Sequence, residues 1–316
     1  LVKGKNKIGT TLRGIGPCYA DKVNRVGLRM NDLVNCLDFE LLDKLELSYK
    51  TVKTLIFNSD YKESETDSCL LYRSFDYCKK YRSFLSHFVA DERKIILPAL
   101  EKSEKIVIEG AQSLYLDLDA GDYPYVTSSN PSTSGTAAAA GIGPKYINNI
   151  YGVMKAYCSR VGEGPFNTEL LNETGDLIRE LGHEYGTTTK RPRRCGWLDL
   201  VRLKNATAIN GVTALCLNHL DTLGKVGTEI GYIKVCTSYN YNYKGIYDEI
   251  TYVPVNADAC QPIYETFEGG WDTTGCKSYD DLPKKAKEFI NFIEEYTGIP
   301  VKFIGIGPDE KDTIIR

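Results

Sequence analysis

The sequence begins with a segment rich in glycine, threonine and cationic side chains. Residues 8–19 read I-G-T-T-L-R-G-I-G-P-C-Y, and Lys22 and Arg25 follow shortly after. Glycines let a backbone approach an anion, threonine hydroxyls donate hydrogen bonds to it, and arginine and lysine supply positive charge. Taken alone, the pattern fits a surface loop with solvated charges somewhat better than an anion-binding loop, and both interpretations stay open. It does not match the phosphate-loop pattern G-x-x-x-x-G-K-[ST], which occurs nowhere in the chain.

A second cationic cluster lies at residues 186–194, G-T-T-T-K-R-P-R-R. Arginine presents a planar fork that suits phosphate or carboxylate, and threonine hydroxyls can fix the orientation of such a group. The pattern favours an anion site. A nucleic-acid patch and a solvated face are the alternatives, and the first has little support because one short cluster sits on an acidic chain.

Two further motifs follow expected strands. The strand at 213–217 runs into N-H-L-D, residues 218–221, and the strand at 303–305 ends in the turn I-G-P, residues 306–308. Ligands of open α/β sheets bind where parallel strands end. A carboxylate at Asp221 could accept hydrogen bonds from the ring N–H and the exocyclic amine of guanine, as in the N-K-x-D motif of GTP-binding folds. The alternatives are a helix cap at Asp221 and a simple chain turn at 305–308.

The segment I-E-G-A-Q, residues 108–112, is expected to end a strand with the amide of Gln112. An acidic group follows at Asp117, Asp119 and Asp122, but its spacing lacks the glycine and the terminal glutamate of a calcium loop, so capping or solvated aspartates are expected. The polar run T-S-S-N-P-S-T-S-G at 127–135 fits a domain linker and a ligand-facing loop equally well.

Short apolar segments alternate with helical patterns, which predicts an α/β fold with a mostly parallel central sheet flanked by helices. Strands are expected at 105–109, within 149–161, at 213–218 and at 300–305, and an antiparallel hairpin within 231–255 turns near residues 244–245. Helices are expected at 174–181, at 284–297, and over 76–102 with a break or end near Pro98.

Composition limits the classes of protein. The 39 Lys and Arg against 42 Asp and Glu give a net charge of −3, which argues against a general nucleic-acid or membrane-surface binder. No apolar run is long enough for a membrane span or a signal peptide. The 10 Cys include no C-x-x-C pair and there are 3 His, so zinc is not expected and the thiols are expected to be reduced. A cytoplasmic protein is predicted.

Together, these motifs resemble the adenylosuccinate synthetase family over almost the whole chain. The matching segments occur in the family's order: I-G-T-T-x-R-G-I-G-P-x-Y-x-D-K-x-x-R, E-G-A-Q, D-Y-P-Y-V-T-S-S-N, S-R-V-G-E-G-P-F-N-T-E, T-T-x-R-P-R-R-C-G-W-L-D, Q-P-I-Y-E-T and G-I-G-P-D. The resemblance implies one ligase domain, residues 1–316, related to P-loop NTPases. It also implies GTP-dependent joining of IMP and L-aspartate to adenylosuccinate, with release of GDP and phosphate, through a 6-phosphoryl-IMP intermediate.

The resemblance also implies site residues. IMP binding falls on Thr11, Arg25, Gln112, Thr127 and Arg191, with Arg25 acting in trans across a homodimer, and Lys22 matches a lysine of the active-site signature. Aspartate binding falls on Thr187, Thr188, Thr189, Lys190, Arg191, Pro192 and Arg193. GTP binding falls on Arg193, His219, Leu220, Asp221, Gly305, Ile306 and Gly307.

The chain departs from the family pattern at three places. Lys190 stands where the family commonly has glycine, and His219 stands where the guanine motif has lysine. The family's phosphate loop, with its catalytic Asp, a Mg²⁺ ligand and a catalytic His, has no match after Leu1. An N-terminally truncated chain is therefore expected, inactive alone and without metal ligands of its own. A catalytically dead IMP-binding dimer module and a nucleic-acid-binding protein are the alternatives.

Overall fold

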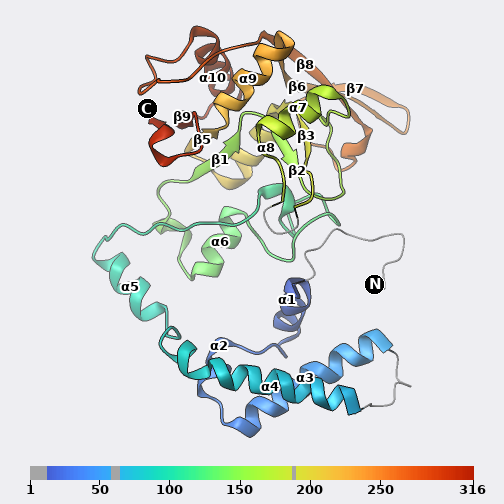
Figure 1. The fold of residues 1–316 in the computed structure, drawn as a ribbon, viewed down its shortest axis with the longest axis vertical. Coiled ribbons are helices and arrows are strands. Elements are labelled where there is room, and N and C mark those ends of the chain that lie inside the picture. The colour runs from blue at the N-terminus through green and yellow to red at the C-terminus, as the bar shows by residue number, and fades with distance from the viewer. Residues whose placement is uncertain (1–12, 58–64, 187–189) are drawn as a thin grey trace. The chain divides into compact units, whose positions relative to one another are not determined.

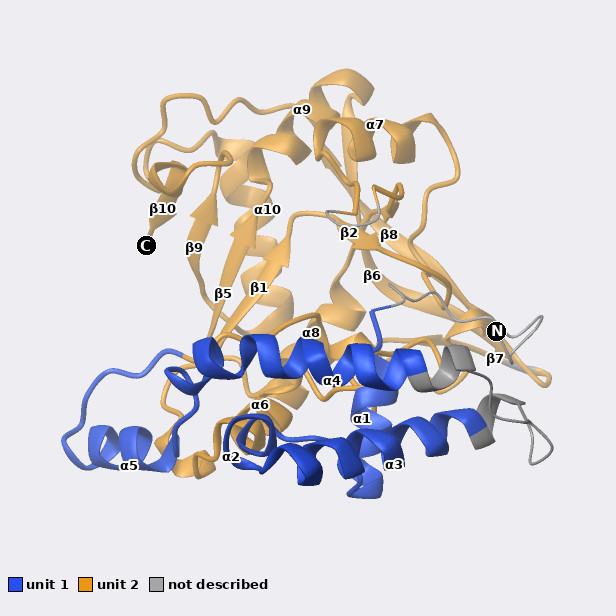
Figure 2. Cartoon of the chain, turned by 60° about the horizontal axis from the view of Figure 1, so that its bottom comes forward, with its two compact units in different colours: residues 1–107 blue, residues 108–316 orange. Residues whose placement is uncertain are grey.

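The computed structural model describes residues 13–57, 65–186 and 190–316. The chain divides into two compact units, residues 1–107 and residues 108–316, which are coloured separately in Figure 2. The α/β class is confirmed, because all β-strands of the described residues lie in unit 2 together with helices, whereas the described elements of unit 1 are helical. The expectation of one domain over the whole chain stays a prediction.

Unit 1 is a set of helices held by ion pairs more than by a core. Leu41 is the one fully buried side chain among those described in this unit. Arg82 ties two helices together: its Nε donates to the carbonyl of Leu33 over 2.8 Å, and its Nη1 lies 2.7 Å from Asp38 Oδ1. The elements of the unit are α1 (Ile15–Asn24), α2 (Met30–Asn35), α3 (Asp38–Phe57), α4 (Glu65–Ser86) and α5 (Arg93–Glu101).

Unit 2 is built on a four-stranded sheet in the order β1-β5-β9-β10, of which Figure 1 labels β1, β5 and β9 and Figure 2 labels all four strands. The first three strands are mutually parallel and β10 is antiparallel to β9, which confirms the mostly parallel sheet. The buried faces of β5 and β9 are apolar, as expected for strands covered on both sides. The strands are β1 (Tyr151–Lys155), β5 (Ala214–Asn218), β9 (Val301–Gly305) and β10 (Thr313–Ile315).

Helices cover this sheet and share its core. Helix α10 buries Phe289, Ile290 and Ile293 at helical spacing and ends at Gly298, whose φ of 74° is favourable for glycine alone. The predicted helices at 174–181 and 284–297 are confirmed, the first with the Asn172 side chain capping its start. The helical elements of unit 2 are η2 (Leu114–Leu116), α6 (Thr133–Ala140), η3 (Pro144–Tyr146), α7 (Glu173–Leu181), α8 (Leu200–Asn210), α9 (Leu220–Ile230), η4 (Ala257–Ala259), α10 (Lys284–Thr297) and η5 (Glu310–Asp312).

Two further sheets, one of two strands and one of four, complete unit 2. The predicted hairpin is confirmed as the antiparallel pair of β6 and β7, but β6 also pairs with β8 and, in parallel, with β4. The hairpin is thus part of a four-stranded sheet, which buries Cys236, Tyr239 and Cys260. The strands are β2 (Cys158–Arg160), β3 (Arg194–Gly196), β4 (Leu198–Asp199), β6 (Tyr232–Tyr243), β7 (Ile246–Ile250) and β8 (Cys260–Glu268).

Two predictions of local structure are wrong. Residues 105–109 belong to no sheet of the described residues, and Val107 is 92% exposed, because an apolar run becomes a buried strand only where another strand pairs with it. The long helix of 76–102 breaks at residues 87–92 and not at Pro98, which lies inside α5. The carboxylate of Asp91 accepts from Arg93 N and so helps to start the new helix. None of the helices described is both long and apolar enough to cross a membrane.

Candidate active site

The carboxyl ends of the three parallel strands form one edge of the first sheet. Lys155, the last residue of β1, pairs in register with Asn218, the last residue of β5. In the next pairing Leu217 of β5 lies opposite Ile304 of β9, so Gly305 ends β9 beside Asn218. This edge is where open α/β sheets bind ligands. The structure therefore brings the two segments predicted to bind guanine together, 219–221 after β5 and 305–307 after β9.

The two glycines at and after the end of β9 lie close against neighbouring polar side chains. A Cβ on Gly305 would lie 2.6 Å from Asn218 Oδ1, and a Cβ on Gly307 would lie 2.4 Å from Asp312 Oδ2. Both contacts are shorter than real Cβ atoms show, so the turn after β9 packs its backbone directly against neighbouring polar side chains.

The guanine motif itself starts α9. His219 is the N-cap residue with φ of 63°, Asp221 lies in the first turn with its side chain 19% exposed, and Lys225 Nζ is 3.6 Å from Asp221 Oδ2. Leu220 is fully buried, and its carbonyl accepts from Trp271 Nε1 over 2.9 Å. The side chain of Leu220 therefore packs in the core, and Asp221 is the residue of the motif whose carboxylate stays accessible.

A buried carboxylate, Glu184, connects this edge to the cationic cluster. Glu184 is fully buried, and its Oε1 lies 2.5 Å from Lys155 Nζ and accepts from Tyr157 OH over 2.7 Å. Its Oε2 accepts from Arg193 Nη1 over 2.7 Å. The hydroxyl of Tyr157 is also 3.3 Å from His219 Nδ1. One network thus joins β1, the cationic cluster and the guanine motif.

The charges of this network determine its protonation. Burial alone would raise the pKa of Glu184, but hydrogen bonds from Lys155, Tyr157 and Arg193 outweigh it and lower the pKa below 4.5. Burial, and after it the positive charge of Lys155, lowers the pKa of His219 below its ordinary 6.5. At neutral pH Glu184 is therefore an anion and His219 is uncharged.

Backbone hydrogen bonds join the described residues on the two sides of 187–189, so that the chain turns back on itself. Lys190 N donates to Gly186 O and Gly186 N donates to Arg191 O, each over 2.8 Å. Lys190 has a φ of 55°, a left-handed conformation that glycine adopts at lower cost. Pro192 pairs with Tyr185 across the turn. The predicted residues 187–189 lie outside the described residues.

The neighbouring Arg194 has a separate partner. Its Nη2 and Nε lie 2.5 and 2.7 Å from the carboxylate of Glu169, and its Nη1 donates to the carbonyls of Gly162 and Gly164. Arg193 and Arg194 of the cluster are therefore engaged by carboxylates of the protein itself. This arrangement weakens the nucleic-acid interpretation, which needs these arginines for phosphates.

The polar run 127–135 folds around Asp117. The buried Asp117 carboxylate accepts from the backbone N–H groups of Asp119, Ala120 and Ser132 and from the Asn130 amide. Burial would raise the pKa of Asp117, but these donors lower it to about 2. Asp117 is thus a capping carboxylate, as one of the two expectations had it, and the run is a structured loop that leads into α6.

The predicted IMP residues lie on separate segments. Thr127 is half-buried, with its N–H donating to Leu116 O over 2.8 Å, and Gln112 is exposed with a φ of 63°. Arg191 lies in the turn described above, and Thr11 falls outside the described residues. The IMP assignments therefore stay predictions.

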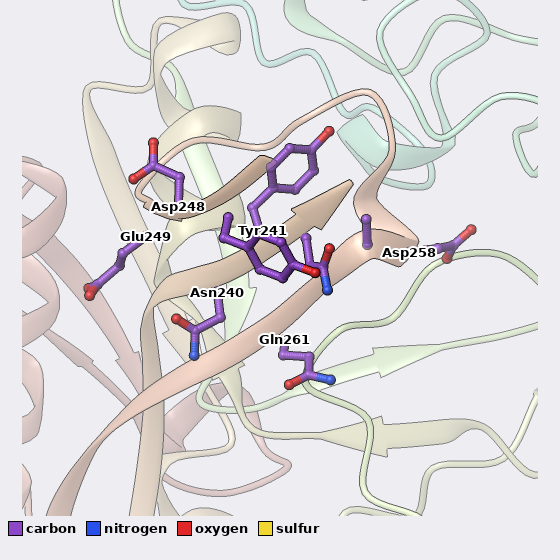
Figure 3. A pocket seen from close by; sticks show the side chains of 9 residues that line it. Asn240, Tyr241, Asp248, Glu249, Asp258 and Gln261 are labelled. Atoms are coloured by element: carbon purple, nitrogen blue, oxygen red, sulfur yellow. The ribbon is translucent and has the colours of Figure 1, made fainter. Parts of the chain in front are cut away.

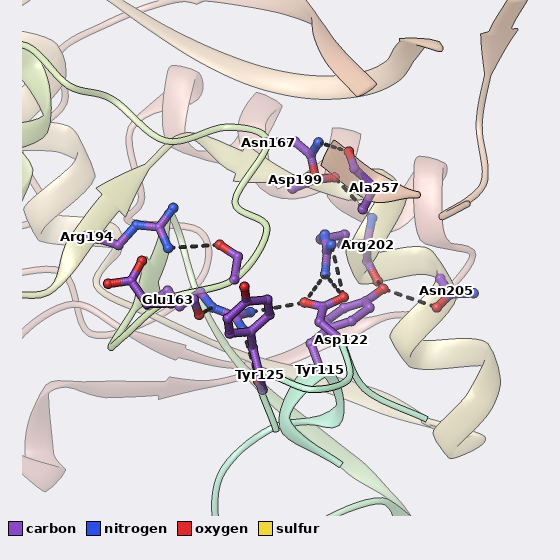
Figure 4. Close-up of polar contacts among 12 residues, drawn as sticks. Tyr115, Asp122, Tyr125, Glu163, Asn167, Arg194, Asp199, Arg202, Asn205 and Ala257 are labelled. Carbon is purple, nitrogen blue, oxygen red and sulfur yellow. Dashed lines mark hydrogen bonds and ion pairs between the residues drawn. The ribbon is translucent and has the colours of Figure 1, made fainter. Parts of the chain in front are cut away.

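Asp122 forms ion pairs with two arginines from other segments of unit 2, Arg160 and Arg202 (Figure 4). Its Oδ2 lies 3.0 Å from both Arg160 Nη1 and Arg202 Nη1, and the three side chains are largely buried. Arg202 also stacks on the ring of Tyr115 at 4.3 Å, and Tyr115 OH donates to the Arg202 carbonyl. A solvated role for Asp122 is therefore wrong, because two arginines from other segments neutralise it.

Lys22 and Arg25 belong to unit 1. Lys22 lies in the last turn of α1 with its Nζ 5.9 Å from the centre of the Tyr19 ring, and Arg25 is the C-cap residue with φ of 64°. Both side chains are exposed. The contacts described within unit 1 do not test the predicted roles of Lys22 in catalysis and of Arg25 in IMP binding, so both stay predictions.

A polar hollow of about 590 Å³ lies on the β6–β7 hairpin, away from the residues predicted from the sequence (Figure 3). Its lining carries three carboxylates and includes none of the predicted site residues. The lining residues are Asn240, Tyr241, Asn242, Tyr247, Asp248, Glu249, Asp258, Ala259 and Gln261. Within the described ranges, no three His, Cys, Asp or Glu side chains group in a way that could hold a metal ion.

The sequence interpretation missed three residues of the network, Lys155, Tyr157 and Glu184. Lys155 ends a strand expected within 149–161, so the rule that placed Asp221 at the sheet edge also applies to it. Glu184 gives no such signal, since its burial depends on partners 29 and 27 residues before it and 9 residues after it.

Fold and site describe a class: an α/β protein in which the segments predicted to bind guanine follow two neighbouring parallel strands and connect through Tyr157 and Glu184 to Arg193. The adenylosuccinate synthetase family model matches residues 1–314. Adenylosuccinate synthetases from Acetivibrio thermocellus and Lysinibacillus sphaericus are 48% and 42% identical, over 99% and 98% of this chain and 72% and 70% of their own length. The fully ligated adenylosuccinate synthetase from Plasmodium falciparum superposes with a TM-score of 0.83 at 38% identity, covering 100% of this chain and 72% of that one. The chain belongs to the adenylosuccinate synthetase family.

Proposed function

We propose that the protein joins IMP and L-aspartate to adenylosuccinate at the expense of GTP, releasing GDP and phosphate, a step of AMP biosynthesis. The family supports this reaction, and one observation in the structure carries it. The segments 219–221 and 305–307 follow the neighbouring parallel strands β5 and β9, and Tyr157 and Glu184 link His219 to the guanidinium of Arg193. A base and an anionic group of one nucleotide can therefore be held at the same place.

The proposed chemistry has two steps. The bond between the γ-phosphorus of GTP and its bridging oxygen breaks while the O6 of IMP bonds to that phosphorus, and N1 loses its proton. The aspartate amine then attacks C6, the C6–O6 bond breaks, and phosphate leaves while the nitrogen loses its proton. Negative charge builds up on the departing GDP and the transferred phosphoryl group in the first step, and on the departing phosphate in the second, while the aspartate carboxylates stay ionised throughout. The contribution assigned to these residues is orientation and charge neutralisation.

Within that scheme each group has a defined task. The carboxylate of Asp221 accepts from the two donors of guanine, and the backbone of 305–307 lies against the base. Arg193 neutralises an anionic group, and Lys190 to Pro192 continue the turn that is proposed to hold aspartate together with residues 187–189. Gln112, Thr127, Arg191 and Thr11 are proposed to bind IMP, and Lys22 to act in catalysis.

Mg²⁺ is proposed to accompany the phosphates of GTP. The described residues do not fit a resident ion, since Asp117 is occupied by four N–H donors and Asp122 by two arginines. No step is therefore assigned to a metal held by this part of the chain. A cytoplasmic location is proposed from composition and family.

A homodimer in which Arg25 completes the IMP site of the other subunit is also proposed. Arg25 is exposed at the end of α1, and α4 carries Leu70, Tyr77 and Phe84 as exposed apolar side chains at intervals of seven residues. Positions seven apart share one face of a helix, so α4 offers an apolar stripe suited to association.

The test of the function is the dependence of turnover on each substrate. The full-length gene product should form adenylosuccinate, identified by mass spectrometry, only when IMP, aspartate and GTP are all present, with one phosphate released per product. Formation of adenylosuccinate with GTP omitted, or no adenylosuccinate with all three substrates present, would rule the assignment out.

A further inference from the structure

Glu184 is a charged group at the centre of the proposed site, and the proposed chemistry gives it no role. Its carboxylate is fully buried, yet Lys155 and Arg193, the two cations that contact it, each keep 28% of their side-chain surface exposed. Burying a carboxylate is costly unless ionic partners satisfy it. Glu184 is therefore shielded from solvent, whereas parts of the Lys155 and Arg193 side chains remain exposed to it.

The charges around Glu184 do not cancel. One carboxylate faces one ammonium and one guanidinium, and its further partner, Tyr157, is neutral because burial and Glu184 raise the pKa of its hydroxyl. A surplus of one positive charge remains. His219, which lies next to Tyr157, is uncharged at neutral pH and does not change this balance. The pair of cations is thus suited to an anion that approaches from the exposed side.

Arg193 is fixed at two points and still has donor capacity. Its backbone N–H donates to the Glu184 carbonyl over 2.8 Å while its Nη1 donates to the Glu184 carboxylate. Its Nε is buried and has no hydrogen-bond partner among the described residues. A buried donor without a partner costs free energy that a ligand oxygen would recover.

We propose that Glu184 is a positioning residue that holds Arg193 and Lys155 together as one two-cation anion site, with Lys155 as its second ligand-binding cation. The inference rests on the proposed function, in which Arg193 serves aspartate and the phosphates of GTP. Lys155 approaches the same edge from β1, beside the guanine motif. Its ammonium is further restrained by Ser159 Oγ at 3.1 Å.

The first test replaces the carboxylate without changing its shape. Glu184→Gln should raise the KM for aspartate or for GTP at least tenfold while the KM for IMP changes less than twofold, because the cations lose the group that orients them. Glu169→Gln is the matched control: it removes the carboxylate partner of Arg194, the adjacent arginine, which has no assigned ligand. The control should leave all three KM values within twofold.

A second test does not depend on the folding of that variant. Lys155→Met keeps the Glu184–Arg193 ion pair, so it should fold, and it should raise the same KM selectively. Lys285→Met is its control, since Lys285 is similarly exposed, at 35%, and pairs with Glu268 instead. A purely structural role would lower the yield or the Tm of these variants without separating one substrate from the others.

Coupling gives the sharpest criterion. If Glu184 acts through Arg193, adding Glu184→Gln to Arg193→Ala should raise the KM no further, whereas adding it to Arg194→Ala should raise it as much as in the wild type. Full additivity with Arg193→Ala, or equal changes in all three KM values for both Glu184→Gln and Lys155→Met, would overturn the inference. In that case the wild type would still join IMP and aspartate, so the proposed function would stand without the inference. Absence of ligation by the wild type would instead remove the proposed function, and the inference with it.

Discussion

Asp221 is the single side chain on which nucleotide choice depends in this account. Its carboxylate stays accessible in the first turn of α9, beside the uncharged His219, whereas Leu220 between them is committed to the core. Asp221→Asn should therefore weaken GTP and favour XTP, whose C2 oxygen accepts from the new amide. The ratio of the kcat/KM values for GTP and XTP should change by a factor that corresponds to a free energy on the order of 1–3 kcal/mol, because one buried hydrogen bond is mispaired.

The control for Asp221 separates base recognition from helix electrostatics. Asp176 occupies the first turn of α7 and pairs with Arg179, as Asp221 occupies the first turn of α9 and lies near Lys225. Asp176→Asn should lose the same helix-dipole interaction without altering the GTP:XTP ratio. An unchanged ratio in Asp221→Asn would leave Asp221 as a helix-start residue only.

At the scale of elements, the sequence pattern predicts a helix or strand correctly where residues close in sequence determine that element. β5, β9 and α10 follow from local periodicity and from Gly298, and they place the guanine motif at the sheet edge. Residues 105–109 have the same apolar pattern, but a strand depends on a partner far along the chain, and that information is absent from the pattern. The Glu184 network could not be predicted from the sequence for the same reason, because its residues come from three separate segments of the chain.

The loop at 127–135 depends on the Asp117 carboxylate. Asp117→Asn should reduce the free energy of unfolding of unit 2 by about 1.5–3 kcal/mol, because charge-assisted hydrogen bonds to three backbone N–H groups are weakened. The folded pKa of about 2 lies below the ordinary 3.8, so this stabilisation is complete above pH 3.8 and is lost as pH falls towards 2. The difference between wild type and variant should therefore be smaller at pH 3 than at pH 7.

Urea unfolding followed by tryptophan fluorescence measures the difference in unfolding free energy between wild type and Asp117→Asn, and it reports on unit 2. Both tryptophans of the chain, Trp197 and Trp271, are buried in unit 2. Asp119→Asn serves as the control, since Asp119 is exposed and accepts from the Asn130 side chain alone among the described contacts. A gap between wild type and Asp117→Asn that stays constant from pH 7 to pH 3 would mean that Asp117 does not act through its charge.

At the scale of the whole molecule, the account depends on a site shared between subunits. If Arg25 acts in trans, Arg25→Leu and Arg191→Leu should each be nearly inactive in the full-length gene product. After subunit exchange, half of the dimers are mixed, and each mixed dimer has one site with both lesions and one with neither. About a quarter of all sites should therefore regain activity.

The mixing experiment has its own control. Arg29 lies four residues after Arg25, is equally exposed, and has no assigned ligand, so Arg29→Leu should retain activity on its own. If mixing Arg25→Leu with Arg191→Leu restores nothing although subunits exchange, every site still carries one lesion. Arg25 would then serve its own subunit or remain a surface charge.

The central claim is that GTP phosphorylates the O6 of IMP before the aspartate amine displaces it. The most direct measurement follows that oxygen: IMP labelled with ¹⁸O at position 6 is converted with unlabelled GTP and aspartate, and the released phosphate is analysed by mass spectrometry. The account predicts one ¹⁸O in each phosphate, because the C6–O6 bond breaks after phosphoryl transfer. Phosphate without label, accompanied by adenylosuccinate formation, would contradict it.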